Sequence, residues 1–220
     1  MSKKLLNQSQ QKVAKDDLIR LCADASDELL LMSRNDCHAL KVSSIVVGRT
    51  ELGGLRRLFL AWPGHQLAEN HLHGKLPVGI HDHRYSLRLK LLFGVVRNTI
   101  YRRGPGRVLH EFEFRSGKMQ QASNAFRVGF AEIEVASQSW LSTDQWLTMK
   151  ADDVHDVDCD GLAAWLVEEG SVEREVTRLF TPKSRVETKE LYLPFDSAQD
   201  VRSHVSRFVT LANASLGTLQ

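Results

Sequence analysis

Cysteine is scarce in this 220-residue chain, which carries only Cys22, Cys37 and Cys159. An odd number at these spacings fits neither a metal-binding C-x-x-C pair nor a disulfide framework. A secretory signal peptide is not expected either, because polar residues 7–12 stand where its apolar core would lie. We therefore expect a protein of the reducing cytoplasm.

Long apolar runs and an excess of charge of one sign are absent as well. No stretch approaches the roughly 20 apolar residues of a membrane-spanning helix, so we expect no membrane partner. The 29 Lys and Arg residues nearly balance the 27 Asp and Glu residues, which gives a formal net charge of +2. This balance gives no reason to expect a nucleic-acid partner. With 42% hydrophobic residues, the chain can fill one sizeable core.

Several widespread catalytic and nucleotide-binding motifs are also missing. The sequence contains no G-x-G-x-x-G, no P-loop and no G-x-S-x-G nucleophile elbow. Their absence disfavours the nucleotide-binding folds that cradle phosphate in a glycine-rich loop, and it disfavours serine hydrolases of the nucleophile-elbow type.

The hydrophobic pattern of the chain changes after about residue 36. Between residues 16 and 32, apolar residues recur at three- and four-residue steps, which predicts an amphipathic helix. A capping box at residues 197–200 begins a second predicted helix near the end of the chain. Between the helices lie alternating or β-branched runs, which predict strands over 42–47, 55–62, 85–93, 95–101, 108–114, 126–135, 140–149, 162–167 and 175–180.

Turn residues separate these runs, including Gly104-Pro105-Gly106 and Asp160-Gly161. Many short strands with such punctuation predict an all-β domain, either an antiparallel sandwich or a β-barrel, with flanking N- and C-terminal helices. We divide the chain into a helical segment over 1–40, a β-barrel over 41–185 and a helical extension over 186–220.

The strongest candidate metal ligands are His81 and His83, two histidines separated by one residue at the start of an alternating run. Positions i and i+2 of a strand lie on the same face, so both imidazoles can point at one metal ion. His155 stands between apolar neighbours in a later run and supplies a third candidate ligand. The alternative is that all three are ordinary strand or turn histidines.

The segment Gly79-Ile80-His81-Asp82-His83, with Gly94 eleven residues further on, resembles the first motif of the cupin superfamily. The resemblance implies a cupin-type antiparallel β-barrel (a double-stranded β-helix), with His155 in the place of the lone histidine of the second motif. The usual glutamate ligand is missing, because Leu87 and Arg88 stand at its positions. The remaining three-histidine set is similar to that of the thiol dioxygenases. The resemblance also implies a homodimer.

A second pair with the same spacing, His71 and His73, lies ten residues upstream in an expected loop. Loop residues can ligate a metal, but no alternating strand pattern surrounds these two. Either they join the metal site or they lie at the surface or against the substrate.

Two further residues are candidates for contact with substrate. Tyr85 shares the face of His83 and is the expected donor or acceptor of a hydrogen bond at the substrate. Arg97 on the next run would act as an anion clamp if it pointed inward, because a buried guanidinium needs an anion. A solvated strand face is the alternative for Arg97.

The residues indicate the metal ligands more directly than they indicate the reaction. We expect a non-haem metal-dependent oxygenase, iron(II) being the expected cofactor, that acts on a small polar or thiol-bearing molecule. Zn(II) or another divalent metal in the same ligands would instead serve an isomerase, lyase or hydrolase. A cupin that only binds a ligand, without catalysis, is the third alternative.

Overall fold

The computed structural model describes residues 8–37, 42–63, 80–115, 125–182, 184 and 192–217. In these ranges the helices are α1 (Gln8–Asp24), α2 (Asp27–Leu30) and α3 (Ala198–Gly217). The strands are β1 (Arg34–Cys37), β2 (Val42–Arg49), β3 (Leu55–Ala61), β4 (Ile80–His81), β5 (Tyr85–Arg115), β6 (Ala125–Trp140), β7 (Leu147–Met149), β8 (Val154–Val172), β9 (Val176–Thr181) and β10 (Tyr192–Pro194).

The N-terminal helix ends earlier than its apolar pattern predicts. The prediction of one helix over 16–32 is wrong at its end, since α1 stops at Asp24 and the short helix α2 follows. Ser26 lies between them with extended backbone, and its Oγ accepts a hydrogen bond from the backbone N–H of Leu29 at 3.4 Å. A serine that caps a new helix in this way competes with continuation of the old one, and the chain turns here.

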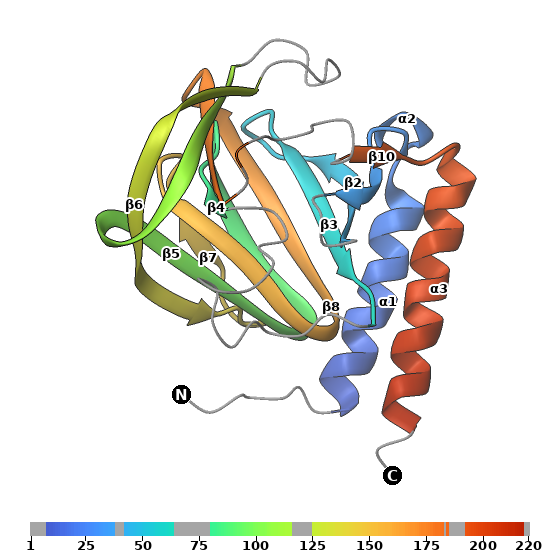
Figure 1. Ribbon diagram of the computed structural model, residues 1–220. Coiled ribbons are helices and arrows are strands. Elements are labelled where there is room, and N and C mark those ends of the chain that lie inside the picture. The colour runs from blue at the N-terminus through green and yellow to red at the C-terminus, as the bar shows by residue number, and fades with distance from the viewer. Residues whose placement is uncertain are drawn as a thin grey trace.

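The C-terminal helix is where the capping box predicts it. The Oγ of Ser197 accepts a hydrogen bond from the backbone N–H of Asp200 at 3.1 Å, and the hydroxyl donates to the Asp200 carboxylate at 2.7 Å. Helices α1 and α3 lie side by side and antiparallel against the sheet (Figure 1). Their buried side chains form one cluster with residues of β2, β3, β5 and β8, which includes Leu18, Cys22, Ile45, Leu58, Phe93, Leu166, Val205 and Phe208.

Apart from these helices, the described part of the chain is mostly strand. The described strands pair antiparallel throughout, in the order β10-β1-β2-β3-β8-β4-β9-β5-β6, and β7 pairs with β5. Strands β1 and β10 extend the sheet beyond β2, although both lie outside the range 41–185. None of the described helices is both long and apolar enough to span a membrane.

Three of the predicted strands are parts of one long strand, β5. The turn predicted at Gly104-Pro105-Gly106 is wrong, since the chain instead forms a bulge in which Arg103 and Arg107 both stand opposite Ile133 of β6. A Cβ atom on Gly106 would lie 2.2 Å from the carbonyl oxygen of Ile133, so the close approach of the two strands requires glycine.

A second pair of glycines bends β5 and β8 together. Gly94 in β5 has φ +82 and Gly161 in β8 has φ +64, and the register shifts between Phe93 and Val95. A Cβ atom on Gly94 would lie 2.4 Å from the carbonyl oxygen of Leu162. The turn predicted at residues 160–161 is therefore wrong, because β8 bends there without ending.

The strand predicted over 140–149 is shorter than expected. Residues 141–146 lie outside the strands, and β7 covers only Leu147–Met149. The side chains of Leu141 and Met149 are both buried, in a cluster with Leu87, Leu89 and Trp165. Burial of spaced apolar residues in a connecting segment imitates the alternation of a strand, which explains the error.

Four strands, among them the short strand β4, close a circuit of pairings. His155 of β8 stands opposite both Ile100 of β5 and His81 of β4. On the other side of β4, Ile80 stands opposite Phe180 of β9, which in turn faces Glu111 of β5. The circuit β4–β8–β5–β9 thus holds the segment that contains His81 and His83 against β8.

Candidate metal centre

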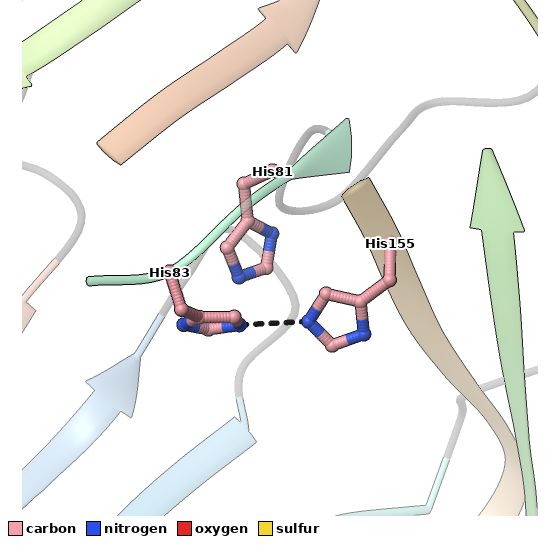
Figure 2. A group of neighbouring side chains, drawn as sticks. All are labelled: His81, His83 and His155. Atoms are coloured by element: carbon pink, nitrogen blue, oxygen red, sulfur yellow. Dashed lines mark hydrogen bonds between the residues drawn. The ribbon is translucent and has the colours of Figure 1, made fainter. Parts of the chain in front are cut away.

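The three histidines singled out in the sequence lie together in the structure. His81 belongs to β4, His83 follows two residues later, and His155 is the second residue of β8 and stands opposite His81. Their rings point toward one another (Figure 2), with centroids 4.6 Å apart for His81 and His83, 5.0 Å for His81 and His155, and 4.9 Å for His83 and His155. Each offers one ring nitrogen, and these three nitrogens all lie within 4.8 Å of one another.

The spacing of these nitrogens fits a divalent metal ion. Nitrogen ligands about 2.1 Å from a metal lie roughly 3 to 3.4 Å apart at octahedral or tetrahedral angles. The Nε2 atoms of His83 and His155 are 2.7 Å apart, slightly closer than this, so these two side chains need to move apart by only a few tenths of an ångström to bind an ion. His155 is buried, and His81 and His83 are half-buried.

Asn98 of β5 fixes the orientation of His155. The Oδ1 of Asn98 lies 2.7 Å from Nδ1 of His155, and both residues are buried. Since an amide oxygen only accepts hydrogen bonds, Nδ1 of His155 carries the proton and Nε2 keeps its lone pair. That lone pair is directed at His83, which donates from its own Nε2 in the absence of a metal. Carbonyl partners of this kind hold metal-binding histidines in other proteins.

Asn98 was not predicted as a site residue, although the sequence places it on one face of an alternating strand. Residues Val96, Asn98 and Ile100 share one face of β5, but which face meets the histidines depends on the pairing with β8. The register places Asn98 opposite Val157 and Ile100 opposite His155, so this face carries the site. The only sequence signal was an amide within an otherwise apolar face of a strand.

Tyr85 lies beside the histidines, on the same side as His83. Its ring centroid is 5.8 Å from that of His83, and the two rings are nearly parallel at 25°. The Tyr85 hydroxyl donates to Oε1 of Glu169 at 3.0 Å. Glu169 is buried and also accepts hydrogen bonds from Nε of Arg57 at 2.6 Å and from the backbone N–H of Leu55 at 3.1 Å. The buried carboxylate of Glu169 is thus hydrogen-bonded to a tyrosine whose ring lies beside His83.

Arg97 lies on the other face of β5 from Asn98. Its guanidinium donates to both carboxylate oxygens of Asp158, at 3.2 Å from Nε and 2.8 Å from Nη2, and lies over the ring of Trp140 at 5.7 Å. In the register, Arg97 stands opposite Asp158, whereas Asn98 stands opposite Val157. The anion that Arg97 contacts here is therefore a carboxylate of the protein itself.

Asp82, between the two ligand histidines, is wholly buried. Its carboxylate accepts hydrogen bonds from Nη1 of Arg174 at 2.7 Å, from Nε of Arg178 at 2.9 Å and from the backbone N–H of Arg178 at 2.5 Å. Sequence reasoning gave this aspartate no role, because neither arginine is near it in the chain.

The remaining histidines divide into two groups. His38, His65 and the alternative pair His71 and His73 lie outside the described residues. His110 and His204 are described, and neither belongs to the cluster of three. His110 of β5 contacts Phe130 of β6, and His204 of α3 contacts Ser43 and Trp62.

Comparisons with known proteins found only remote likenesses. No model of a known family and no curated protein matches the sequence. Among solved structures, hydroquinone 1,2-dioxygenase from Sphingomonas sp. TTNP3 with 4-hydroxybenzoate bound is similar at 11% identity and a TM-score of 0.32, over 59% of this chain and 66% of that one, a little under two thirds of its length.

Two other solved structures are similar over more of the chain. Hydroquinone 1,2-dioxygenase PnpCD in complex with Cd²⁺ and 4-hydroxybenzonitrile matches at 10% identity and a TM-score of 0.35, over 88% of this chain and 89% of that one. Cellulomonas parahominis L-ribose isomerase with L-psicose matches at 10% identity and a TM-score of 0.35, over 91% and 98%. Likenesses of this strength carry no argument about fold or function.

Proposed function

We propose that His81, His83 and His155 bind one divalent metal ion and that the protein is a non-haem metal-dependent oxygenase, with iron(II) as its cofactor. The substrate is a small polar or thiol-bearing molecule that binds at the metal. The observation that carries the proposal is the convergence of three imidazoles, one of them fixed by Asn98 with its Nε2 lone pair toward the others. Three neutral ligands would leave about three positions of an octahedral ion for substrate and dioxygen.

The residues around the histidines have proposed roles in orienting His155, limiting the access of water and contacting the substrate. Asn98 holds the His155 ring, and the apolar side chains of Val96, Ile100 and Val157 on the same face limit the access of water. Tyr85 presents its phenol oxygen beside His83 while its proton is bonded to Glu169. The phenol oxygen can accept a hydrogen bond from a hydroxyl, amine or thiol of the substrate, and Glu169 can take the phenol proton.

Further parts of the proposal rest on the sequence pattern. We propose that the described sheet is a cupin-type β-barrel of the three-histidine, thiol-dioxygenase-like branch; the closed circuit β4–β8–β5–β9 supports a barrel. The division into 1–40, 41–185 and 186–220, a homodimer and a cytoplasmic location are proposals on the same footing. Arg97 is proposed as an anion clamp on the face of β5 opposite to Asn98, where an anionic substrate would have to displace Asp158 from it.

The first experiment is elemental analysis of the full chain purified without a metal-chelating tag. The wild type is compared with His81→Ala, His83→Ala and His155→Ala, and with His110→Ala as a matched histidine outside the cluster. We expect near-stoichiometric metal in the wild type and in His110→Ala, and loss of metal in the three cluster variants. Unchanged metal content in all three cluster variants would refute the ligand assignment.

Oxygen consumption then tests the reaction. The metal-free protein is loaded with iron(II) under anaerobic conditions and mixed with candidate thiols and small polar molecules in aerated buffer. Oxygen uptake that depends on iron, on substrate and on His83 supports an oxygenase. Stoichiometric metal without uptake for any candidate would count against it.

A zinc-dependent isomerase, lyase or hydrolase is the second candidate function. The specific observation in its favour is the hydrogen bond from Tyr85 to the buried Glu169, which is an acid–base pair that needs no oxygen. Zinc in the purified protein, and turnover that persists without oxygen, would favour this reading. A protein that purifies and stays free of metal would favour a ligand-binding module.

A further inference from the structure

We infer that Asp82 is the positioning residue of the metal centre: by binding Arg174 and Arg178, it fixes the spacing of the His81 and His83 imidazoles and so sets the metal affinity. The inference rests on the proposed function, because it takes the three histidines as ligands. It assigns a role to a residue that itself touches neither the metal nor the substrate.

The need for such a residue follows from the shortness of β4. The strand ends at His81, so no sheet ladder continues through His83. Backbone hydrogen bonds in this stretch run from Asp82 N–H to the Arg178 carbonyl at 3.0 Å and from His83 N–H to the Ala151 carbonyl at 3.0 Å. These two bonds locate the backbone, but a ligand separation that suits a metal has to be held to a few tenths of an ångström.

The Asp82 side chain supplies the missing constraint. One carboxylate oxygen accepts the backbone N–H of Arg178, so Asp82 and Arg178 are joined by reciprocal main-chain and side-chain bonds. The other oxygen accepts both guanidinium groups, from Arg174 and Arg178. Arg174 also reaches the Ala151 carbonyl at 3.4 Å, the same carbonyl that holds His83. Asp82 thus ties the segment to β9 and to the turn before β8.

Alternation makes this constraint act on both ligands at once. In extended backbone, residue i+1 points away from residues i and i+2, so a clamp on Asp82 fixes the direction of both His81 and His83. The Asp82 side chain is held rigidly because it is wholly buried and its hydrogen bonds to the two arginines are charge-assisted. The side chains of these arginines, Arg174 and Arg178, are only 26% and 27% exposed. Asp82 therefore preorganises two of the three ligands from the opposite face of the chain.

The test uses Asp82→Asn, which keeps the side-chain size and removes the charge. Glu168→Gln is the matched control, because Glu168 is also a buried carboxylate held by two arginines, Arg56 and Arg88, but on a part of β8 paired with β3. The affinity for Co²⁺ is measured by competition with a chelator, together with the visible absorption of bound Co²⁺. Urea unfolding gives the folded fraction of each protein.

We expect Asp82→Asn to bind Co²⁺ roughly 10- to 100-fold more weakly than the wild type while still folded, with an altered absorption band. Glu168→Gln should lose stability but keep its Co²⁺ affinity and spectrum. Equal Co²⁺ affinity in folded Asp82→Asn and wild type would overturn this inference and leave the metal site standing. No Co²⁺ binding by the wild type would overturn the proposed function and this inference together.

If Asp82→Asn does not fold, Arg174→Gln decides the question. This substitution removes one of the two guanidinium groups from Asp82 and leaves the bonds to Arg178 in place. Weaker Co²⁺ binding by folded Arg174→Gln supports the inference. Unchanged binding overturns it.

Discussion

Nδ1 of His155 lies 2.7 Å from Oδ1 of Asn98, and the two side chains come from neighbouring strands, β8 and β5. This hydrogen bond determines which nitrogen of His155 can serve as a metal ligand. Since it is buried on both sides, it is not replaced by water when it is broken.

Replacing Asn98 should therefore weaken metal binding more than it alters the fold. We expect Asn98→Leu to lose roughly 10- to 100-fold in metal affinity, because His155 can then rotate or change tautomer. Asn98→Asp keeps an acceptor at the same place and should lose less. The measurement is metal affinity by chelator competition, with Thr99→Val as a control, since Thr99 is buried on the other face of the strand. Equal losses in Asn98→Leu and Thr99→Val would contradict the role given to Asn98.

The ion pair of Arg97 and Asp158 should contribute to stability. Arg97→Ala would leave the Asp158 carboxylate buried without its bidentate partner, and we expect the free energy of unfolding to fall by about 3 kcal/mol. The side chains of this pair are only 14% and 9% exposed. Urea unfolding of Arg97→Ala and of Arg20→Ala compares it with a surface pair.

Arg20 and Asp17 form the control pair, with side chains 70% and 39% exposed. Water and salt screen such a pair, so Arg20→Ala should change the free energy of unfolding by less than about 0.5 kcal/mol. Equal effects of the two substitutions would show that burial does not distinguish these ion pairs.

His204 should make the protein less stable in acid. Burial, and then the positive charge of Arg207, lower the pKa of His204 from 6.5 to about 4. The ring is packed against Trp62 and Phe195, and its Nε2 lies 2.7 Å from Ser43 Oγ. As the pH falls below 6.5, His204 becomes protonated in the unfolded chain but stays neutral in the folded chain. The free energy of unfolding therefore decreases until about pH 4.

Urea unfolding between pH 7 and pH 4 measures this effect. We expect His204 to account for a loss of roughly 2 to 3 kcal/mol over that range, at 1.36 kcal/mol for each unit of pKa difference. The variant His204→Gln does not titrate there, so its pH profile should be flatter than that of the wild type. Parallel profiles for the two proteins would rule out His204 as the source.

Cys159 should be unreactive while the protein is folded. Burial, with the charges of Asp158 and Asp160, raises the pKa of the Cys159 thiol to about 12. Only about one thiol in ten thousand would then be ionised at pH 8, and the thiolate is the reactive form. Peptide mapping after N-ethylmaleimide treatment should find Cys159 unlabelled in the native protein and labelled in guanidinium. Rapid native labelling would contradict its buried position.

Much of this architecture can be predicted from the sequence, because it depends on local pattern. Period-two alternation predicts most of the strand segments, and the capping box predicts where α3 begins. The H-x-H spacing predicts that His81 and His83 point the same way, as their rings do. Errors arise where glycine suggests a turn, at residues 104–106 and 160–161. A glycine that permits a bulge or a bend has the same local signature as one that ends a strand.

By itself, the sequence determined which histidines could share a face, since side-chain direction along a strand follows from the chain's own geometry. Only the tertiary structure decided that His155 stands opposite His81, that Asn98 holds its ring, and that Arg174 and Arg178 converge on Asp82. The physical reason is register. A shift of one residue between β5 and β8 would bring Arg97 to the site in place of Asn98, and that register is set by glycine bulges and burial across strands far apart in the chain.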